Sequence, residues 1–255
     1  MSAKTKASNE SITIMEVQRG VIDMCILGTT PMICNSMSSK VLQELLLPKG
    51  RKSAAEKQST LKHNPYEEYR DSIYRLGEDR NTLIAMPSTA FKGALRSSAV
   101  DLPGSTKAQI GRLTYVPGDY VEIFGRPQLL MSVTRCADMN RTPDVRTRAI
   151  IAEWACKVTV VYTQPILKQQ AIVNLMAAAG IMQGIGDWRP EKGKGDYGQF
   201  KIVSPDDKDF KRIIKQGRDV QIKAMDDAEC YDMETEKMLR WFDNESAARG
   251  FEVAA

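Results

Sequence analysis

The chain has little of the chemistry that many enzymes and secreted proteins depend on. Its 255 residues include one histidine, His63, and five scattered cysteines with no CxxC or Cys/His spacing. This argues against a zinc site and a disulfide framework, and we expect neither a metal nor another cofactor. No apolar run reaches the roughly 18 residues of a membrane-spanning helix, and no apolar core follows the polar start MSAKTK. We therefore expect no contact with a membrane, no secretory signal and a reduced, cytoplasmic setting.

The charge is unevenly distributed along the chain. Residues 226–255 hold nine acidic and three basic side chains, a local net charge of −6, so residues 1–225 carry +10 of the total of +4. A basic body with an acidic tail is common among nucleic-acid-binding proteins, although a solvated surface that is merely asymmetric explains it equally well. The basic residues form three clusters: Lys49, Arg51 and Lys52; Arg135, Arg141, Arg146 and Arg148; and Arg189, Lys192 and Lys194.

Hydrophobic periodicity predicts the order of the secondary structure. We expect strands at 17–27, 82–86, 121–124, 128–134, 154–163 and 200–203, and helices at 38–47, 65–76, 88–100, 166–182, 207–222 and 232–250. This order predicts an α+β fold with a ferredoxin-like or RRM-type core, long insertions and a helical C-terminal extension. The expected division is a disordered N-terminus at 1–11, a domain at 12–203 with insertions at 28–80 and 135–150, and an acidic extension at 204–255.

The first segment that carries chemistry is 86–96, with the sequence MPSTAFKGALR. Lys92 and Arg96 are four residues apart, which places both cations on one face of the predicted helix. The free N–H groups of a helix start can bind a phosphate oxygen, and Gly93 and Ala94 allow another backbone to come close. The alternative interpretation is a capped helix with a solvated basic face.

The second segment is 184–200, with the sequence GIGDWRPEKGKGDYGQF. Its glycines allow the backbone to curl around a ligand. Trp188 and Tyr197 offer flat faces on which bases can stack, and Arg189, Lys192 and Lys194 can contact phosphates. The segment lacks the GK[ST] ending of a P-loop, and it follows a helix, unlike a Rossmann fingerprint. The alternative interpretation is a long hairpin around a packed tryptophan.

Together these two segments resemble the RAMP superfamily, the RRM-fold proteins of CRISPR effector complexes. Segment 86–96 is similar to the P-G-S-S-x-K-G-x-x-R helix start of that family, and segment 184–200 is similar to its glycine-rich loop. The likeness spans about residues 17–203 and is closest to the backbone subunits. The chain has MPST in place of PGSS, its loop contains Trp188-Arg189-Pro190, and residues 204–255 have no counterpart. These departures fit a diverged relative, for example one carried by a phage.

The resemblance implies a role in antiviral defence, as a single-stranded RNA or DNA binder that assembles head to tail with copies of itself and with other effector subunits. It implies that Ser88, Lys92 and Arg96 lie on the helix that contacts the nucleic-acid backbone. Residues 136–149 would form the thumb-like hairpin that enters between bases, and residues 38–64 would form a second lobe facing the ligand.

Catalysis is the weaker expectation. Some RAMP proteins cleave RNA, and His63, Asp23, Asp138 or Asp144 could be proposed for proton transfer, or Asp187, Glu191 and Asp196 for a divalent ion. No spacing favours any of them, so we assign no catalytic residue. Two alternatives therefore stay open: an endoribonuclease of the same superfamily, and a protein-only structural or assembly factor such as a phage morphogenesis protein.

Overall fold

The computed structural model describes residues 14–47, 50, 61–135, 141–193 and 195–251. Its central sheet has the strand order β10-β1-β9-β6-β4-β3, with β5 paired to β9 beside β6. The strands of this sheet are β1 (Gln18–Gly28), β3 (Tyr74–Arg75), β4 (Ile84–Pro87), β5 (Thr114–Tyr115), β6 (Tyr120–Phe124), β9 (Ala155–Gln164) and β10 (Phe200–Val203).

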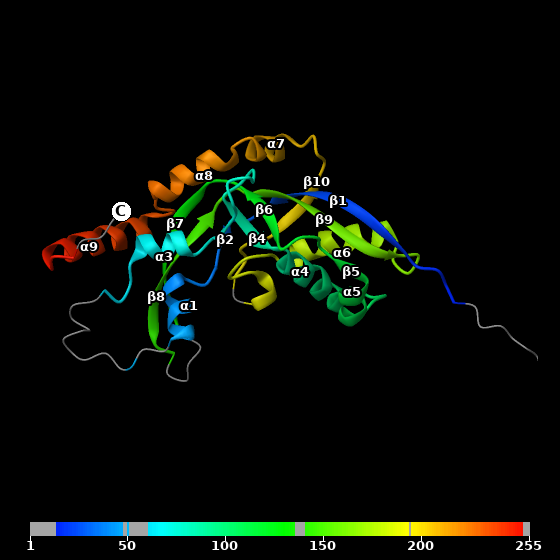
Figure 1. The fold of residues 1–255 in the computed structure, drawn as a ribbon, viewed down its shortest axis with the longest axis horizontal. Helices are drawn as coiled ribbons and strands as arrows, with labels where there is room; N and C mark the ends of the chain where they lie inside the picture. The colour runs from blue at the N-terminus through cyan, green and yellow to red at the C-terminus, as the bar shows by residue number, and fades with distance from the viewer. Residues whose placement is uncertain (1–13, 48–49, 51–60, 136–140, 194, 252–255) are drawn as a thin grey trace, which may run out of the picture.

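The core of this sheet is ferredoxin-like. In chain order, β1, α4 (Ser88–Asp101), β5, β9, α6 (Gln169–Met182) and β10 form the β-α-β-β-α-β unit. Each pair of neighbours among β10, β1, β9 and β5 is antiparallel, with β1 and β9 in the centre. Helices α4 and α6 pack against each other, and with α5 (Lys107–Leu113) they lie below the sheet in Figure 1. The predicted α+β fold with a ferredoxin-like core is thus confirmed.

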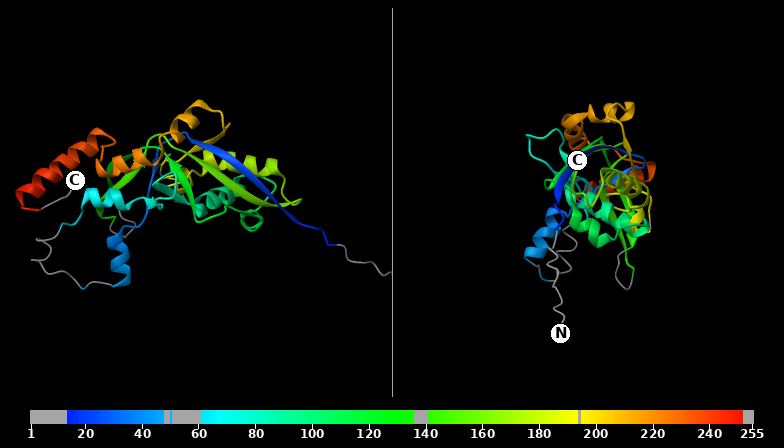
Figure 2. Two further views of the ribbon diagram at one scale, coloured as in Figure 1. Left: turned by 45° about the horizontal axis from the view of Figure 1, so that its top comes forward. Right: turned by 90° about the vertical axis from the view of Figure 1, so that its right-hand side faces the viewer.

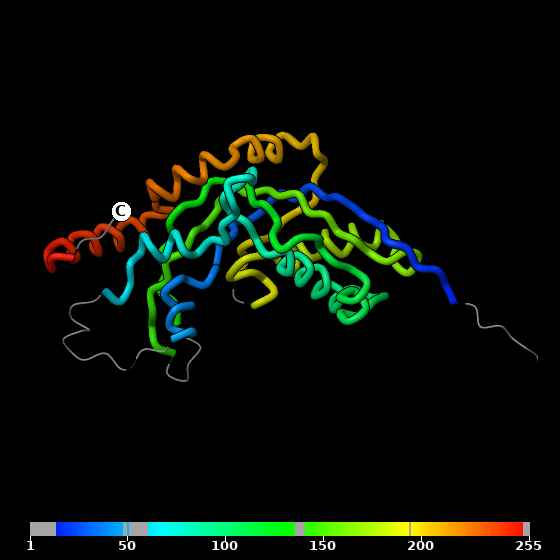
Figure 3. Tube along the Cα trace, viewed as in Figure 1, coloured from blue at the N-terminus to red at the C-terminus, as the bar shows by residue number. Residues whose placement is uncertain are grey.

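Successive side chains of β1 point to opposite faces of the sheet, and near the end of this strand both faces are buried. Met24 and Ile26 belong to the main core beneath α4 and α6, whereas Leu27 joins a second cluster. That second cluster is completed by Phe210 and Ile213 of α7 (Lys208–Ile214), which covers the opposite face of the sheet. The trace in Figure 3 shows α7, α8 (Gly217–Asp226) and α9 (Met233–Ala248) following one another along that side.

A smaller sheet of β2 (Met32–Ile33), β8 (Pro143–Ile151) and β7 (Pro127–Arg135) continues away from the core. Strands β7 and β8 form an antiparallel hairpin in register from Pro127↔Ile151 to Arg135↔Pro143. The sequence predicted the first strand, but it placed residues 136–149 in a polar excursion. The structure puts 143–151 in a strand because Thr147, Arg148 and the three residues that follow are buried against neighbouring segments.

The two helical segments beside the hairpin differ in how they pack. Helix α3 (Pro65–Asp71) buries Tyr66 and Tyr69 in the main core. Helix α1 (Ser39–Leu46) begins where the spacing predicted, with the Ser38 side chain capping the Val41 N–H, yet it buries none of its residues. Figure 2 shows α1 standing away from the sheets.

Candidate functional site

The start of α4 lies directly at the end of β4. Pro87 is the N-cap residue and Ser88 is the first helical residue, so no loop separates the strand from the helix. The Ser88 N–H donates to the Asp119 carbonyl oxygen at 2.9 Å, and no side chain of the described residues caps this helix. The positive end of the helix dipole is therefore not offset by a local capping group.

The glycine-rich loop joins α6 to β10 and is held against β2. The Asp187 N–H donates to the Ile33 carbonyl oxygen at 3.0 Å. Gly186 has a φ of +82°, and a Cβ at this position would lie 2.6 Å from the same carbonyl oxygen. A side chain at Gly186 would therefore strain the backbone and push the loop away from β2.

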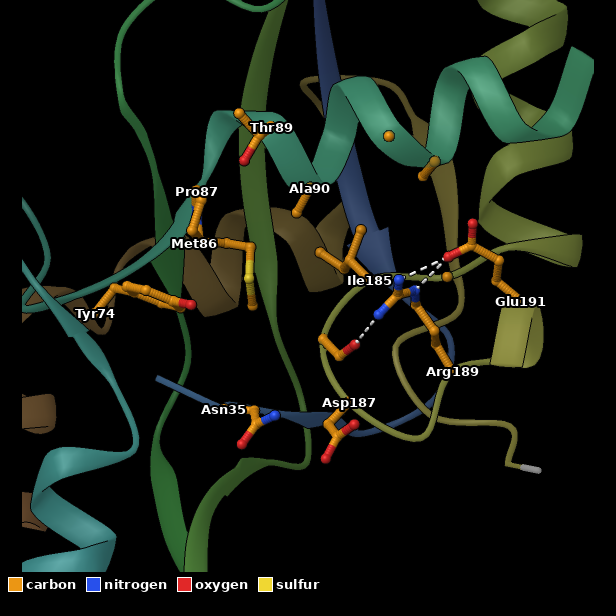
Figure 4. A pocket seen from close by; sticks show the side chains of 14 residues that line it. Asn35, Tyr74, Met86, Pro87, Thr89, Ala90, Ile185, Asp187, Arg189 and Glu191 are labelled. Carbon is orange, nitrogen blue, oxygen red and sulfur yellow. Dashed lines mark hydrogen bonds and ion pairs between the residues drawn. The ribbon is translucent and has the colours of Figure 1, made fainter. Parts of the chain in front are cut away.

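The start of α4 and the glycine-rich loop meet around one cavity of about 330 Å³. Figure 4 shows that the cavity lies between the first turns of α4, the loop and a wall formed by Tyr74, Met86 and Asn35. The two segments that sequence analysis singled out are thus adjacent in space. The lining residues are Asn35, Tyr74, Met86, Pro87, Thr89, Ala90, Gly93, Ala94, Gly184, Ile185, Gly186, Asp187, Arg189 and Glu191.

The charged side chains on the cavity wall are one guanidinium and two carboxylates. Arg189 donates to Glu191 Oε2 at 2.6 and 2.9 Å and to the Gly186 carbonyl oxygen at 2.8 Å. Glu191 Oε1 also accepts from Ser97 Oγ at 2.9 Å, which ties the loop to α4. Burial works to raise the pKa of Glu191, but hydrogen bonds from Arg189 and Ser97 hold this pKa below its usual value. Glu191 is therefore an anion at neutral pH, and the Arg189 guanidinium is already engaged in an ion pair with it.

Beside the cavity, β8 contributes a buried arginine. Arg148 is 8% exposed, forms an ion pair with Asp187, and places its guanidinium 5.4 Å from the centre of the Trp188 ring. The Trp188 ring lies 6.2 Å from that of Tyr197. Burial lowers the pKa of Arg148, and Asp187 opposes this shift. Arg148 therefore joins the hairpin to the glycine-rich loop rather than presenting a free cation.

The exposed cations of the hairpin lie farther along the same strands. Arg146 is two residues from Arg148 on β8, so both side chains belong to one face of the hairpin. Arg146, Arg135 and Arg141 are all exposed, and Arg146 Nε is 3.9 Å from Asp144 Oδ2. We call Arg135, Arg141 and Arg146 the hairpin arginines. Arg146, Arg148 and Trp188 form a basic and aromatic path toward the cavity on this face, whereas Arg135, directly opposite Pro143, belongs to the other face of the hairpin.

The other predicted contact residues are not on the cavity wall. Lys92 is half-buried on α4, and the exposed Arg96 lies beside Gly111 of α5. Ser88 is 4% exposed, and its hydroxyl has no hydrogen-bond partner in the described part of the chain. Lys192 is exposed in the short 3-10 turn Pro190–Lys192. Four further predicted contact residues lie outside the described residues: Lys49, Arg51, Lys52 and Lys194. Residues 1–11, which the sequence predicts to be disordered, also lie outside them.

Three residues of the cavity wall were missed by sequence analysis. Thr89 directly follows Ser88 and is exposed. The hydroxyl group that α4 places on the cavity wall is therefore that of Thr89, whereas the sequence favoured Ser88. Asn35 and Tyr74 come from the long segment between β1 and β4. Nothing in their local sequence marks them, because only the packing of that segment brings them to α4.

His63 lies in an ion-pair cluster rather than in the cavity. Its Nδ1 is 2.7 Å from Glu68 Oε1 and its Nε2 is 3.1 Å from Asp144 Oδ1, which also accepts from Lys62 Nζ at 2.8 Å. Both ring nitrogens are therefore engaged, and the cluster joins the start of α3 to β8. Among the described residues, no three His, Cys, Asp or Glu side chains are grouped so as to hold a metal ion, and no helix is long and apolar enough to cross a membrane.

The His63 cluster predicts a pH-dependent contact. The hydrogen bond with Glu68 is the largest cause of a raised His63 pKa, which burial opposes and Asp144 supports. The protonated ring therefore adds stability that is complete below its unfolded pKa of about 6.5 and is lost as pH rises through the raised folded pKa. We expect less than about 1 kcal/mol because the ring is partly exposed. Urea unfolding of wild type and His63→Gln at pH 6 and pH 9 measures it, and equal pH dependence in both proteins would contradict it.

Comparisons with known proteins give a likeness in structure. No family model matches the sequence, and the curated proteins contain no match. Among solved structures, the chain is similar to a chain of "Cryo-EM structure of the Type III-B Cmr-beta bound to cognate target RNA", at 14% identity and a TM-score of 0.36. The match covers 73% of this chain and 59% of the similar chain. This chain therefore spans less than two thirds of the length of the similar chain.

The second similar structure is "Crystal structure of Cmr6 from Pyrococcus furiosus", at 10% identity and a TM-score of 0.34. That match covers 73% of this chain and 98% of the other. The likeness is one of fold, at TM-scores below 0.5, and it assigns no ligand to this chain.

Proposed function

We propose that this chain binds single-stranded nucleic acid, RNA in preference to DNA, with one nucleotide in the cavity and its neighbours along the hairpin. The observation that carries the proposal is the meeting of the α4 start and the glycine-rich loop around one cavity, next to Arg148 and Trp188 of the basic and aromatic path. A volume of about 330 Å³ lies within the range of small-molecule sites.

The composition of the wall favours a base in the cavity and phosphates outside it. Tyr74, Met86 and Ile185 offer flat or apolar contacts, and the Asn35 amide can both donate and accept hydrogen bonds at a base edge. Asp187 and Glu191 already neutralise Arg148 and Arg189, so a phosphate inside the cavity would face more carboxylates than free cations. The phosphates are better served by the exposed hairpin arginines and by Lys92 and Arg96.

A head-to-tail array of copies along the strand is the assembly we propose, with other effector subunits as further partners. The support is the resemblance of the two sequence motifs and the position of the hairpin, which projects away from the ferredoxin-like core and could reach a neighbouring copy. Sedimentation with RNA of increasing length tests it. The mass of the complex should rise by one chain for each fixed increment in RNA length.

The binding proposal is tested first on the protein purified from its native host. The absorbance ratio and the sequence of any extracted nucleic acid, with ribonuclease and deoxyribonuclease controls, identify the ligand. RNA of defined length with a common end would support a guide-bound subunit. Heterogeneous single strands would indicate a general coating protein. A clean protein that also fails to shift labelled single strands at low salt would refute binding and favour a protein-only assembly role.

Gly93→Leu should separate binding from folding. Gly93 lines the cavity from within α4, and a Cβ at this position meets no atom within 4 Å. Leucine should therefore occupy part of the cavity, and it should stabilise the helix by about 0.5–1 kcal/mol because glycine is a poor helix former. We expect RNA affinity to fall at least tenfold while the melting temperature is unchanged or higher.

Gly93→Ala is the matched control for this variant. It improves helix propensity to a similar degree but adds only a methyl group, so RNA affinity should stay within about threefold of wild type. Fluorescence anisotropy with a labelled single strand measures both variants. Wild-type affinity in a correctly folded Gly93→Leu protein would exclude the cavity from the binding site.

A further inference from the structure

Strand β1 has a free backbone edge over half its length. It pairs with β9 from Gln18↔Gln164 to Leu27↔Ala155, but on its other side it pairs with β10 only from Cys25↔Val203 to Gly28↔Phe200. Between residues 18 and 24, no strand of the described chain lies on the β10 side. In Figure 1 this part of β1 runs along the outer border of the sheet, beyond the end of β10.

This edge lacks three of the usual protections against pairing with another strand, namely proline, lysine and a bulge. The stretch 18–24 reads QRGVIDM and contains neither proline nor lysine, and its pairing with β9 advances residue by residue with no bulge. Val21 is 59% exposed in its centre. An unpaired row of N–H and C=O groups beside an exposed valine is a template for a further strand.

The exposed side chains on this edge are complementary to themselves. Arg19, Val21 and Asp23 alternate along β1 and project on the face opposite to Met24. If a second β1 pairs antiparallel with Val21 opposite Val21, then Arg19 of each copy stands opposite Asp23 of the other. A shift of two residues in either direction loses both charge pairs, and a shift of one places these side chains on opposite faces.

Both charges also make contacts within the chain, on the outer face of the sheet. Arg19 Nη1 donates to the Tyr115 hydroxyl at 3.2 Å, and its guanidinium lies 5.5 Å from the centre of that ring. Asp23 Oδ1 accepts from Thr159 Oγ1 at 2.5 Å, which leaves Oδ2 available. Thr159 lies on β9 and Tyr115 on β5 beyond it, so both contacts are on the β9 side of β1, and Arg19 must turn from Tyr115 toward the free edge when it pairs with Asp23 of a second copy.

We propose that two copies of this chain associate edge to edge through residues 19–23 of β1, forming a twofold dimer with one continuous sheet. Because the order Arg19, Val21, Asp23 is complementary to itself in antiparallel pairing, it favours a second copy over a strand of another protein. None of these residues lines the cavity. The dimer therefore needs no nucleic acid and goes beyond the proposed binding function.

Charge reversal tests the pairing in protein freed of nucleic acid. Wild type should show a concentration-dependent species of twice the 28.5 kDa chain mass in analytical ultracentrifugation. Arg19→Asp or Asp23→Arg places like charges opposite each other twice per dimer, so each should raise the dissociation constant about tenfold or more. The double exchange Arg19→Asp/Asp23→Arg restores both pairs and should recover wild-type association. Thermal unfolding of dilute protein checks that each variant is folded.

A cysteine at the twofold axis tests the register independently. Val21→Cys should form a disulfide-linked dimer under mild oxidation, because directly opposite residues of antiparallel strands have Cα atoms about 4.5–5.5 Å apart. Val100→Cys, at an equally exposed position on α4, is the control and should not cross-link above the wild-type level. The proposal is overturned if wild type stays monomeric at several hundred micromolar, if the double exchange fails to rescue, or if both cysteine variants cross-link equally. None of these results depends on RNA binding.

Discussion

Alanine at all three hairpin arginines, Arg135, Arg141 and Arg146, should weaken single-stranded RNA binding by about 30- to 100-fold at about 0.15 M salt. Each exposed cation that contacts a phosphate of a single strand contributes about 0.7 to the slope of log affinity against log salt, so three contacts account for a slope of about 2. The loss should be nearly the same for all sequences, because phosphate contacts carry no base identity. Anisotropy titrations at four salt concentrations give both the affinity and the slope.

The matched control removes the same charge from another surface. Lys201, Lys208 and Lys215 are exposed on β10 and around α7, the helix that covers the face of the central sheet opposite to α4 and α6. Alanine at these three positions should change the affinity by less than about threefold. Equal losses in the two triple variants would mean that overall charge, and not the hairpin, attracts the strand.

The double variant Lys92→Ala/Arg96→Ala tests whether the two cations of α4 contact the nucleic-acid backbone. Neither side chain lines the cavity, but both lie on the helix whose start forms its wall. If the strand follows α4 as the sequence motif implies, the double variant should flatten the salt slope by about 1.4, and its effect should add to that of the hairpin variant. An unchanged slope would remove α4 from the path of the backbone.

Gln221→Leu should destabilise the fold by about 3 kcal/mol or more. Gln221 on α8 is fully buried and makes four hydrogen bonds with the main chain. Its Oε1 accepts from the N–H groups of Leu83 and Ile84 at 2.8 and 3.0 Å, and its Nε2 donates to the carbonyl oxygens of Ile123 and Gly125 at 2.8 and 3.0 Å. Leucine has similar volume but leaves these four groups without a partner, at about 1–3 kcal/mol for each buried group that stays unsatisfied.

The control for this variant is the same substitution on an exposed helix surface. Gln170 lies on α6 and hydrogen-bonds only to Asn174 in the described structure, so Gln170→Leu should cost less than about 0.5 kcal/mol. Chemical denaturation followed by circular dichroism measures both. A small cost for Gln221→Leu would show that α8 docks on β4 and β6 without that amide. The predicted loss would show that the C-terminal helices stabilise the sheet that carries the site.

Local pattern was enough to predict most elements and the plan of the core. The predicted strand at 154–163 is β9, the predicted helix at 166–182 contains α6, and the glycine-rich loop lies between α6 and β10 as expected. These predictions rest on periods of two and about 3.6 residues and on glycine and proline, which act over a few residues. The second arm of the hairpin was missed because its sequence contains Arg146, Thr147 and Arg148, and only tertiary packing buries the last two of these polar residues.

By itself, the sequence predicted five of the six elements of the ferredoxin-like core, all but the two-residue strand β5, and it singled out two segments as candidates for binding. The tertiary structure alone decided how they meet. It showed that α4 faces the loop through Thr89, Ala90, Gly93 and Ala94, that Arg148 and Arg189 are already paired with carboxylates, and that β1 keeps a free edge. The physical reason is the distance along the chain between the residues that interact. Spacing along the chain sets the faces of each helix and strand, whereas ion pairs, cavities and free edges depend on residues far apart in sequence that only the folded topology brings together.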